Sequence, residues 1–201
     1  MNAKAVFLDK DGTLIEDMPY NVDPELIRLS AGALEALRLL QDLGYRLIVV
    51  TNQSGVARGY FQEEKLRQVE ERLRQLLSSA GIRLSGFYYC PHHPQGVVSQ
   101  YALECPCRKP RPGMLYDAAR ECHLDLRASW LVGDILNDVE AGNRAGCRTI
   151  LIDNRHETEW ILTPIREPGF LVKDLKEAAQ VITSESLERK MNYGKQEQRS
   201  N

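Results

Sequence analysis

The sequence predicts an α/β fold, a doubly wound, Rossmann-like parallel sheet with helices on both faces. Short apolar runs alternate along the chain with segments of helical periodicity. The runs are apolar at almost every position, which is typical of strands buried on both sides. A chain of 201 residues suits one such domain, which we expect to span residues 1–183.

Six short runs of aliphatic or aromatic residues are predicted strands. They are residues 5–8, 47–50, 87–89, 129–132, 149–152 and 170–172. Between them, apolar residues recur every three or four positions, which predicts helices. These lie at residues 33–43, 66–77, 113–122, 138–145 and 174–182. Ser30 is expected to cap the first helix and Gly44 to end it. We expect residues 184–201, which lack an apolar face, to be a polar tail, either a frayed helix or a disordered segment.

Bulk composition limits the partners. The net charge of −2 and the sequence pI of about 6.1 give no broad basic field, which disfavours nucleic acid. The longest aliphatic runs hold only about four residues, whereas a bilayer span needs roughly 20. The N-terminus enters a strand without a signal region, so a cytoplasmic location with reduced thiols is expected. No long apolar stripe demands a partner, so we expect a monomer.

Two carboxylates follow the first predicted strand. Asp9 and Asp11 stand two positions apart, so in extended backbone they point the same way. A divalent cation would offset their repulsion, and Gly12 would allow a sharp turn around a bound anion. The alternative is an acidic turn after a buried strand, since turns favour Asp and Gly.

Polar residues also follow two later strands. Thr51 comes directly after the strand at 47–50, and Asp134 follows the strand at 129–132 after one glycine. The carboxyl ends of parallel strands meet at one edge of a sheet, where such proteins bind ligands. Polar residues follow the end of a predicted strand in three places. We therefore expect Asp9, Asp11, Thr51 and Asp134 to share one cleft.

A loop between the third strand and the third helix has metal-ligand spacing. The candidate ligands are Cys90, His92 or His93, Cys105 and Cys107. Three thiolates and an imidazole suit tetrahedral zinc, and four protein ligands leave no open position, so this zinc would stiffen the loop at 90–107. Free surface thiols or a disulfide are the alternatives. Cys122 and Cys147 are expected to be core residues.

Two cations, Arg108 and Lys109, follow the last of these cysteines. A loop fixed by zinc would present them to the cleft, where Arg offers a planar fork and Lys a compact charge to phosphate. A solvated basic loop is the alternative. Arg58 is a weaker candidate for the same role.

Several strings now resemble a known family. DKDGT at residues 9–13, Thr51, Lys109 and GDILND at residues 133–138 are similar to the four motifs of the haloacid dehalogenase superfamily of phosphatases. TNQSGVARG, CPHHPQG and CPCRKPRPGM resemble, within it, the heptose bisphosphate phosphatase family. Its zinc pattern, Cys-x-His with Cys-x-Cys, selects His92 by resemblance.

The resemblance implies a mechanism. Asp9 would attack phosphorus and carry an aspartyl-phosphate, and Asp11 would act as acid and then base. Thr51 and Lys109 would bind the phosphoryl oxygens, while Asp9, the Asp11 backbone carbonyl and Asp134 would hold Mg²⁺. The implied reaction is removal of the 7-phosphate of D-glycero-D-manno-heptose 1,7-bisphosphate. A histidinol-phosphate phosphatase is the nearest alternative, and a zinc-bearing interaction module without turnover is a rival of another class.

The resemblance also implies a set of substrate contacts. They are Asp17, Tyr20, Thr51, Asn52, Gln53, Ser54, Arg108 and Lys109. Two departures from the family are Ile135, where a basic residue is frequent, and Lys10, where Arg is common. With no large cap insertion, the zinc loop and short neighbouring loops would form the substrate rim. Asp138 is expected to support the metal indirectly or to cap a helix.

Overall fold

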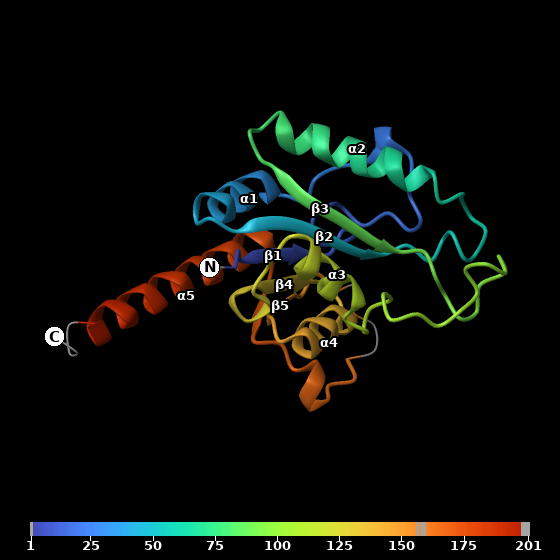
Figure 1. Cartoon of the computed structure of the whole chain (residues 1–201). Coiled ribbons are helices and arrows are strands. Elements are labelled where there is room, and N and C mark those ends of the chain that lie inside the picture. Colours follow the sequence, from blue (N-terminus) through green and yellow to red (C-terminus); the bar gives the residue numbers. More distant parts are fainter. Residues whose placement is uncertain (1, 156, 158–159, 198–201) are drawn as a thin grey trace.

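A computed structural model describes residues 2–155, 157 and 160–197 and confirms the predicted α/β class (Figure 1). Six parallel strands form one sheet in the order β3-β2-β1-β4-β5-β6. The strands are β1 (Ala5–Leu8), β2 (Arg46–Asn52), β3 (Leu84–Cys90), β4 (Trp130–Gly133), β5 (Arg148–Ile152) and β6 (Phe170–Val172). The helices are α1 (Ala33–Asp42), α2 (Lys65–Ser78), α3 (Gly113–Glu121), α4 (Leu136–Ala145) and α5 (Leu175–Glu197). Three short 3₁₀ turns lie at Pro24–Leu26, Leu126–Ala128 and Pro164–Arg166.

Alternating strand side chains build two apolar layers. Val6 and Leu8 of β1 pack in the layer that includes α1, α2 and α5, whereas Ala5 and Phe7 pack toward α3 and α4. All four β1 residues are fully buried, which explains why the strand is apolar throughout. The two layers place helices on both faces of the sheet, as predicted (Figure 1).

Two helix ends differ from the prediction. The N-cap of α1 is Gly32, with φ of +73°, and Ser30 contributes only its backbone carbonyl, which accepts from Ala33 N at 3.0 Å. Gly44 ends the helix as expected, with φ of +79°. Helix α5 continues to Glu197, well past the predicted end near residue 182, because Leu, Glu, Arg, Lys and Met favour helix. Residues 184–197 are therefore helical and not the disordered alternative, and residues 198–201 lie outside the described residues.

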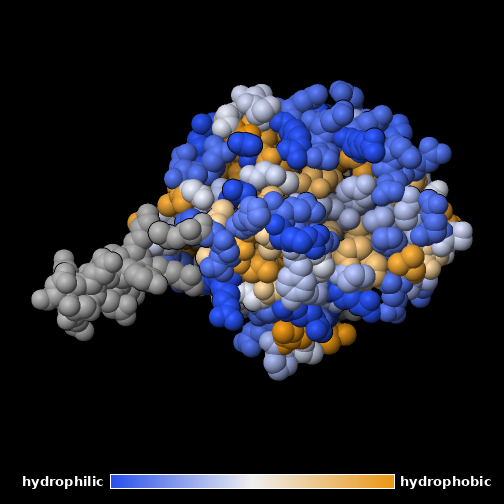
Figure 2. All heavy atoms as spheres, in the orientation of Figure 1, coloured by the Kyte–Doolittle hydropathy of each residue, from blue (hydrophilic) through white to orange (hydrophobic). Residues whose placement is uncertain are grey.

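The face of the molecule drawn in Figure 2 is largely polar. Figure 2 shows a face dominated by hydrophilic residues, with apolar residues in small separate areas. In the described part of the chain, no helix combines the length and apolar character needed to cross a bilayer. The monomeric state stays a prediction.

Strand register brings the motifs to one edge. Leu8 pairs with Val49 of β2 and with Val132 of β4, so the residues that follow these positions emerge side by side. The backbone N–H of Asp9 donates to the carbonyl of Val132 at 2.9 Å. Strand order reverses direction between β1 and β4, which is where open α/β sheets form ligand crevices.

Candidate active site

Three buried carboxylates meet at this edge. Asp9 follows β1, Asp134 follows β4, and Asp138 lies in the first turn of α4, with ligand oxygens within 4.8 Å of one another. The approach of Asp138 depends on Gly133, because a Cβ at that position would lie 2.3 Å from Asp138 Oδ2. The glycine that precedes Asp134 therefore makes room for a third carboxylate.

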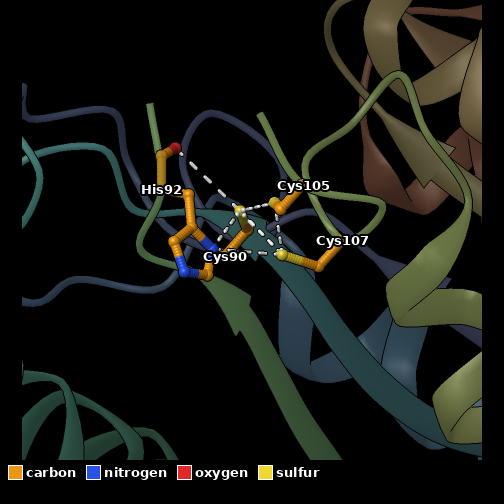
Figure 3. A group of neighbouring side chains, drawn as sticks. All are labelled: Cys90, His92, Cys105 and Cys107. Atoms are coloured by element: carbon orange, nitrogen blue, oxygen red, sulfur yellow. Dashed lines mark hydrogen bonds between the residues drawn. The ribbon is translucent and has the colours of Figure 1, made fainter. Parts of the chain in front are cut away.

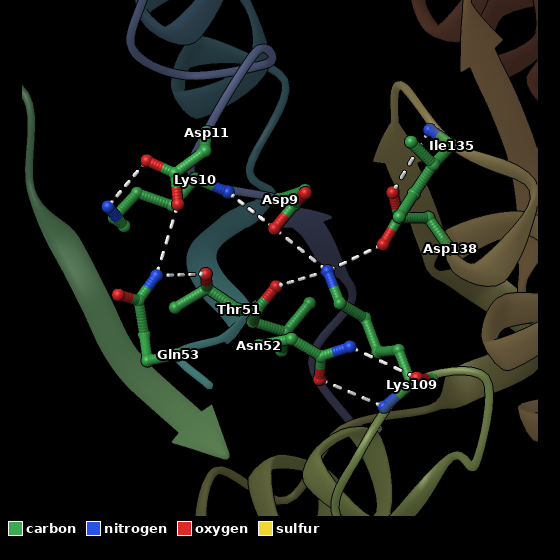
Figure 4. A network of polar contacts seen from close by, with 10 residues as sticks. Asp9, Lys10, Asp11, Thr51, Asn52, Gln53, Lys109, Ile135 and Asp138 are labelled. Atoms are coloured by element: carbon green, nitrogen blue, oxygen red, sulfur yellow. Dashed lines mark hydrogen bonds and ion pairs between the residues drawn. The ribbon is translucent and has the colours of Figure 1, made fainter. Parts of the chain in front are cut away.

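Lys109 lies between two of these acids (Figure 4). Its Nζ is 2.8 Å from Asp9 Oδ1 and 2.5 Å from Asp138 Oδ1, and it donates to the Val50 carbonyl at 2.9 Å. Lys109 is only 1% exposed. Burial alone would lower its pKa, but Asp138 and Asp9 outweigh that effect and raise it, so the lysine is an ammonium.

The same burial acts on the acids. It raises the pKa of Asp9 to about 7, although the neighbouring Lys109 charge opposes the rise. Burial also raises the pKa of Asp138. One ammonium among three carboxylates leaves a deficit of positive charge. An all-oxygen acidic set of this kind fits Mg²⁺, which prefers carboxylate ligands.

The acidic set holds Asp9 and Asp134, the two carboxylates that the resemblance implies, and adds Asp138, which was expected to support the metal indirectly or to cap a helix. The third carboxylate beside Asp9 and Asp134 is Asp138, while the Asp11 side chain turns toward Lys10. The ligand role implied for the Asp11 backbone carbonyl stays a prediction. Asp138 also accepts from the backbone N–H of Ile135 at 3.3 Å, so its second oxygen contacts the helix start.

Gln53 links Asp11 to Thr51 (Figure 4). Its Nε2 donates to Asp11 Oδ2 at 3.0 Å and to Thr51 Oγ1 at 2.9 Å, while Lys10 Nζ lies 2.6 Å from Asp11 Oδ1. An amide nitrogen only donates, so Thr51 Oγ1 must accept here. Its own proton can then be given to a phosphoryl oxygen.

Five of the eight predicted substrate residues line one cleft. A hollow of about 270 Å³ is bordered by Asp11 and by five of the expected contacts. These are Asp17, Tyr20, Asn52, Gln53 and Ser54. Arg108 and Lys109 border a second hollow of about 200 Å³ beside the cysteine loop. Individual substrate contacts stay predictions.

Asn52 joins β2 to the cysteine loop. Its Nδ2 donates to the Lys109 carbonyl and its Oδ1 accepts from the Lys109 N–H, both at 3.0 Å. Both polar ends of the side chain thus bond the backbone of Lys109. Asn52 positions that lysine, whatever further contact it makes with a substrate.

The cysteine loop gathers its four predicted ligands (Figure 3). Cys90, His92, Cys105 and Cys107 lie with donor atoms within 4.8 Å of one another. The sulfur atoms are 2.7–3.3 Å apart, and His92 Nδ1 is 3.4 Å from Cys107 Sγ. Tetrahedral zinc with Zn–S bonds of about 2.3 Å places sulfur atoms about 3.8 Å apart, while a disulfide needs about 2.05 Å. All five cysteines are free, so the disulfide alternative is wrong and the set fits a bound ion.

The choice between the two histidines follows from this geometry. His92 lies in the cluster, whereas His93 Nε2 contacts Arg58 at 3.2 Å. Cys147 is buried in the core as predicted, and Cys122 is half-buried against it. Contact with Cys90 and burial raise the pKa of the Cys107 thiol.

One residue of the site escaped the sequence argument. Asn154, two positions after β5, donates to the Gly12 carbonyl at 2.7 Å and to Asp134 Oδ2 at 3.2 Å. It supports the turn after β1 and orients one acid of the cluster. Asn154 follows a buried strand, as Asp9, Thr51 and Asp134 do, and this position could have identified it as a residue of the site.

Comparison with known proteins agrees with this geometry. Residues 106–178 match the family model described as HAD-hydrolase-like. D-glycero-beta-D-manno-heptose-1,7-bisphosphate 7-phosphatase of Pasteurella multocida is 41% identical over 182 residues, covering 86% of this chain and 98% of the relative. The protein of the same name in Escherichia coli K12 is 37% identical over 185 residues, covering 88% and 97%.

A solved structure extends the likeness to the fold. D,D-heptose 1,7-bisphosphate phosphatase of B. bronchiseptica, complexed with magnesium and phosphate, superposes with a TM-score of 0.77 at 31% identity. The match covers 90% of this chain and 99% of that one. On this sequence identity and this shared fold, the chain belongs to the haloacid dehalogenase superfamily of phosphatases, in the family of the D-glycero-beta-D-manno-heptose-1,7-bisphosphate 7-phosphatases.

Proposed function

We propose that the protein removes the 7-phosphate of D-glycero-beta-D-manno-heptose 1,7-bisphosphate in a Mg²⁺-dependent reaction. The observation that carries the proposal is the meeting of Asp9, Lys109 and Asp134 at one buried sheet edge, with Thr51 linked to Asp11 through Gln53. The names of the relatives supply the sugar and its anomer.

The residues divide the reaction into two displacements. Asp9 attacks phosphorus and the bond to the sugar oxygen breaks, while Asp11 gives that oxygen a proton. Water then attacks the phosphoryl group on Asp9, and Asp11 takes the water's proton, so that inorganic phosphate leaves. Thr51 and Lys109 hold the phosphoryl oxygens in line. Mg²⁺, held by Asp9, Asp134 and the Asp11 carbonyl, supplies positive charge that lowers the repulsion between carboxylate and phosphate.

The cysteine loop has a positional role in this proposal. Zinc held by Cys90, His92, Cys105 and Cys107 fixes a loop whose next residues are Arg108 and Lys109. With four protein ligands the ion offers no site to water, so it stabilises the loop and does not activate a nucleophile. Asn52 fixes the same segment from the β2 side.

Replacing Cys107 by serine tests that role. We expect zinc content to fall below about half an equivalent, and kcat to fall about 10- to 100-fold, as when outer-shell residues of a site are lost. Magnesium titration should still show a bound ion, because the acids are unchanged. The matched control is Cys122→Ser, which alters a half-buried cysteine outside the cluster. Full activity of Cys107→Ser with zinc lost would refute the positional role.

Substrate choice is tested by a phosphate-release panel. Purified protein with Mg²⁺ is given both anomers of the heptose bisphosphate and histidinol phosphate. We expect kcat/KM for the beta anomer to exceed that for histidinol phosphate by about 100-fold, since a second phosphate can form charge-assisted hydrogen bonds that an imidazole cannot. A preference for histidinol phosphate would overturn the substrate assignment in favour of the alternative.

The remaining properties belong to the same proposal. We infer a monomeric, cytoplasmic enzyme with one domain over residues 1–183 and without nucleic-acid or membrane partners. The acidic pI and the polar visible face support this inference.

A further inference from the structure

An edge-to-face aromatic pair joins two loops beside the cleft. Tyr20 belongs to the segment between β1 and the 3₁₀ turn at Pro24–Leu26, and Tyr60 belongs to the segment between β2 and α2. The ring centroids are 4.6 Å apart, and the ring planes make an angle of 82°. Aromatic quadrupoles favour this geometry, which stabilises a contact beyond the area that it buries. The pair therefore links the loops that follow two adjacent strands, β1 and β2.

The backbone of Tyr20 has a conformation that costs free energy. Its φ is +57°, in the left-handed region, which bulky residues rarely adopt. The residue lies in a turn in which the N–H of Asn21 donates to the carbonyl of Met18 at 3.1 Å. Strained conformations of this kind persist only where surrounding contacts hold them, and they are frequent at active sites and ligand clamps. A contact that offsets the strain is therefore expected, and the Tyr60 ring provides one.

Tyr60 is the more firmly placed member of the pair. Its backbone N–H donates to the carbonyl of Gly55 at 2.9 Å. The next residue, Phe61, packs so closely on Gly55 that a Cβ there would clash with the Phe61 ring. Two contacts thus tie the Tyr60 segment to Gly55, which lines the cleft. Because its own loop places the Tyr60 ring, that ring can hold the Tyr20 ring in turn.

The pair lies between two hollows. Tyr20 lines the hollow of about 270 Å³ that Asp11 also borders, and Tyr60 lines a second hollow of about 600 Å³. Tyr20 is 48% exposed and Tyr60 is 60% exposed, so neither residue belongs to the core. The contact between them therefore shapes the wall of the cleft more than it stabilises the fold.

We propose that Tyr60 is a positioning residue for substrate binding. It holds the Tyr20 ring at the rim of the cleft, and Tyr20 in turn contacts the sugar. This inference rests on the proposed function, in which Tyr20 is one of the expected substrate contacts. A ring that is already fixed loses less conformational entropy when a substrate binds, so the pair should lower KM. Tyr60 lies outside the residues that line the cleft, so it should not affect kcat.

Replacing Tyr60 by leucine tests the contact. The expected result is a rise of about two- to tenfold in KM for the heptose bisphosphate, the contribution of one aromatic pair, with kcat within about twofold of the wild type. Tyr60→Phe keeps the ring, so both constants should stay within about twofold. Tyr116→Leu removes a ring that is 47% exposed on α3 and should change neither constant. An unchanged KM in Tyr60→Leu, or a fall in kcat instead of a rise in KM, overturns the inference.

A double variant shows whether Tyr60 acts through Tyr20. If it does, the two losses are not additive, and Tyr20→Leu/Tyr60→Leu should have the KM of Tyr20→Leu alone. A KM raised by the product of the two single effects would mean that Tyr60 acts independently of Tyr20, which overturns the inference. Both residues are exposed, so the variants should fold, and melting temperature checks this. Tyr60→Gln, which also lacks the ring, replaces Tyr60→Leu if the leucine variant does not fold.

Nuclear magnetic resonance tests the contact without a substrate and so separates this inference from the proposed function. In protein with isotope-labelled tyrosine, Tyr20→Phe identifies the ring signals of Tyr20. A neighbouring aromatic ring shifts such signals, so Tyr60→Leu should move them and Tyr116→Leu should not. Unmoved Tyr20 signals would mean that the rings do not meet, and the inference would then be wrong whatever the substrate. Failure of the wild type to hydrolyse the heptose bisphosphate overturns the proposed function instead, and the KM comparison then uses the substrate of the phosphate-release panel with the highest kcat/KM.

Discussion

Replacing Asp9 by asparagine is expected to lower phosphate release by about four orders of magnitude or more, since loss of a covalent nucleophile in a serine protease costs on the order of 10⁶ in kcat. The amide keeps the size of the side chain and can still bond the Lys109 ammonium, which lies 2.8 Å from Asp9 Oδ1. The fold should therefore survive. Steady-state phosphate release with the heptose bisphosphate measures the loss, and melting temperature checks the fold.

Asp11→Asn is the informative comparison. As a general acid and base, Asp11 should contribute about 10²–10⁴ to turnover, less than the nucleophile. With an aryl phosphate, whose leaving group needs no proton, the first displacement should persist while hydrolysis slows. Phosphorylated enzyme should then accumulate, and mass spectrometry of an acid-quenched digest should find one phosphoryl group on the peptide that holds Asp9. Activity of Asp9→Asn within tenfold of wild type would remove Asp9 from the mechanism and favour the non-catalytic zinc module.

Much of the site could be predicted because it depends on strand ends. Asp9, Thr51 and Asp134 follow apolar runs, and parallel strands deliver such positions to one edge. The predicted zinc ligands could be recognised for another reason, since Cys and His at short spacing have few structural uses where thiols are expected to be reduced. In both cases the spacing of the residues along the sequence was enough to predict that their side chains lie close together.

The parts that escaped depend on side-chain direction. The direct place of Asp138 in the acidic cluster depends on the room that Gly133 leaves, and Asn154, two residues past the end of β5 at the same sheet edge, donates to Asp134. Neither fact follows from periodicity. The contact of Arg58 with His93 joins two loops with no shared pattern, so it needed coordinates. The prediction ended the last helix near residue 182 because the apolar periodicity stops there. The residues that follow favour helix by their intrinsic propensity, so α5 continues to Glu197 without an apolar face.

Lys109→Met should be the most destabilising single change at the site. The ammonium is 1% exposed and lies 2.8 Å from Asp9 Oδ1 and 2.5 Å from Asp138 Oδ1. Removing one partner of a buried ion pair typically costs ~3–5 kcal/mol, because the remaining charge stays buried without compensation. Urea unfolding without Mg²⁺ should show that loss. Turnover should fall by about 10²–10³, as for other residues that stabilise charge in the transition state.

A second substitution separates the two effects of Lys109. In Lys109→Met/Asp138→Asn, one uncompensated acid is gone, so part of the lost unfolding free energy should return while turnover stays low. Added Mg²⁺ should stabilise Lys109→Met more than the wild type, because its carboxylates lack the ammonium and bind the cation without competition. If the double variant regained activity along with stability, Lys109 would act only through the charge balance of the acids. Its predicted contact with the phosphoryl oxygens would then be wrong, since methionine provides no donor for it.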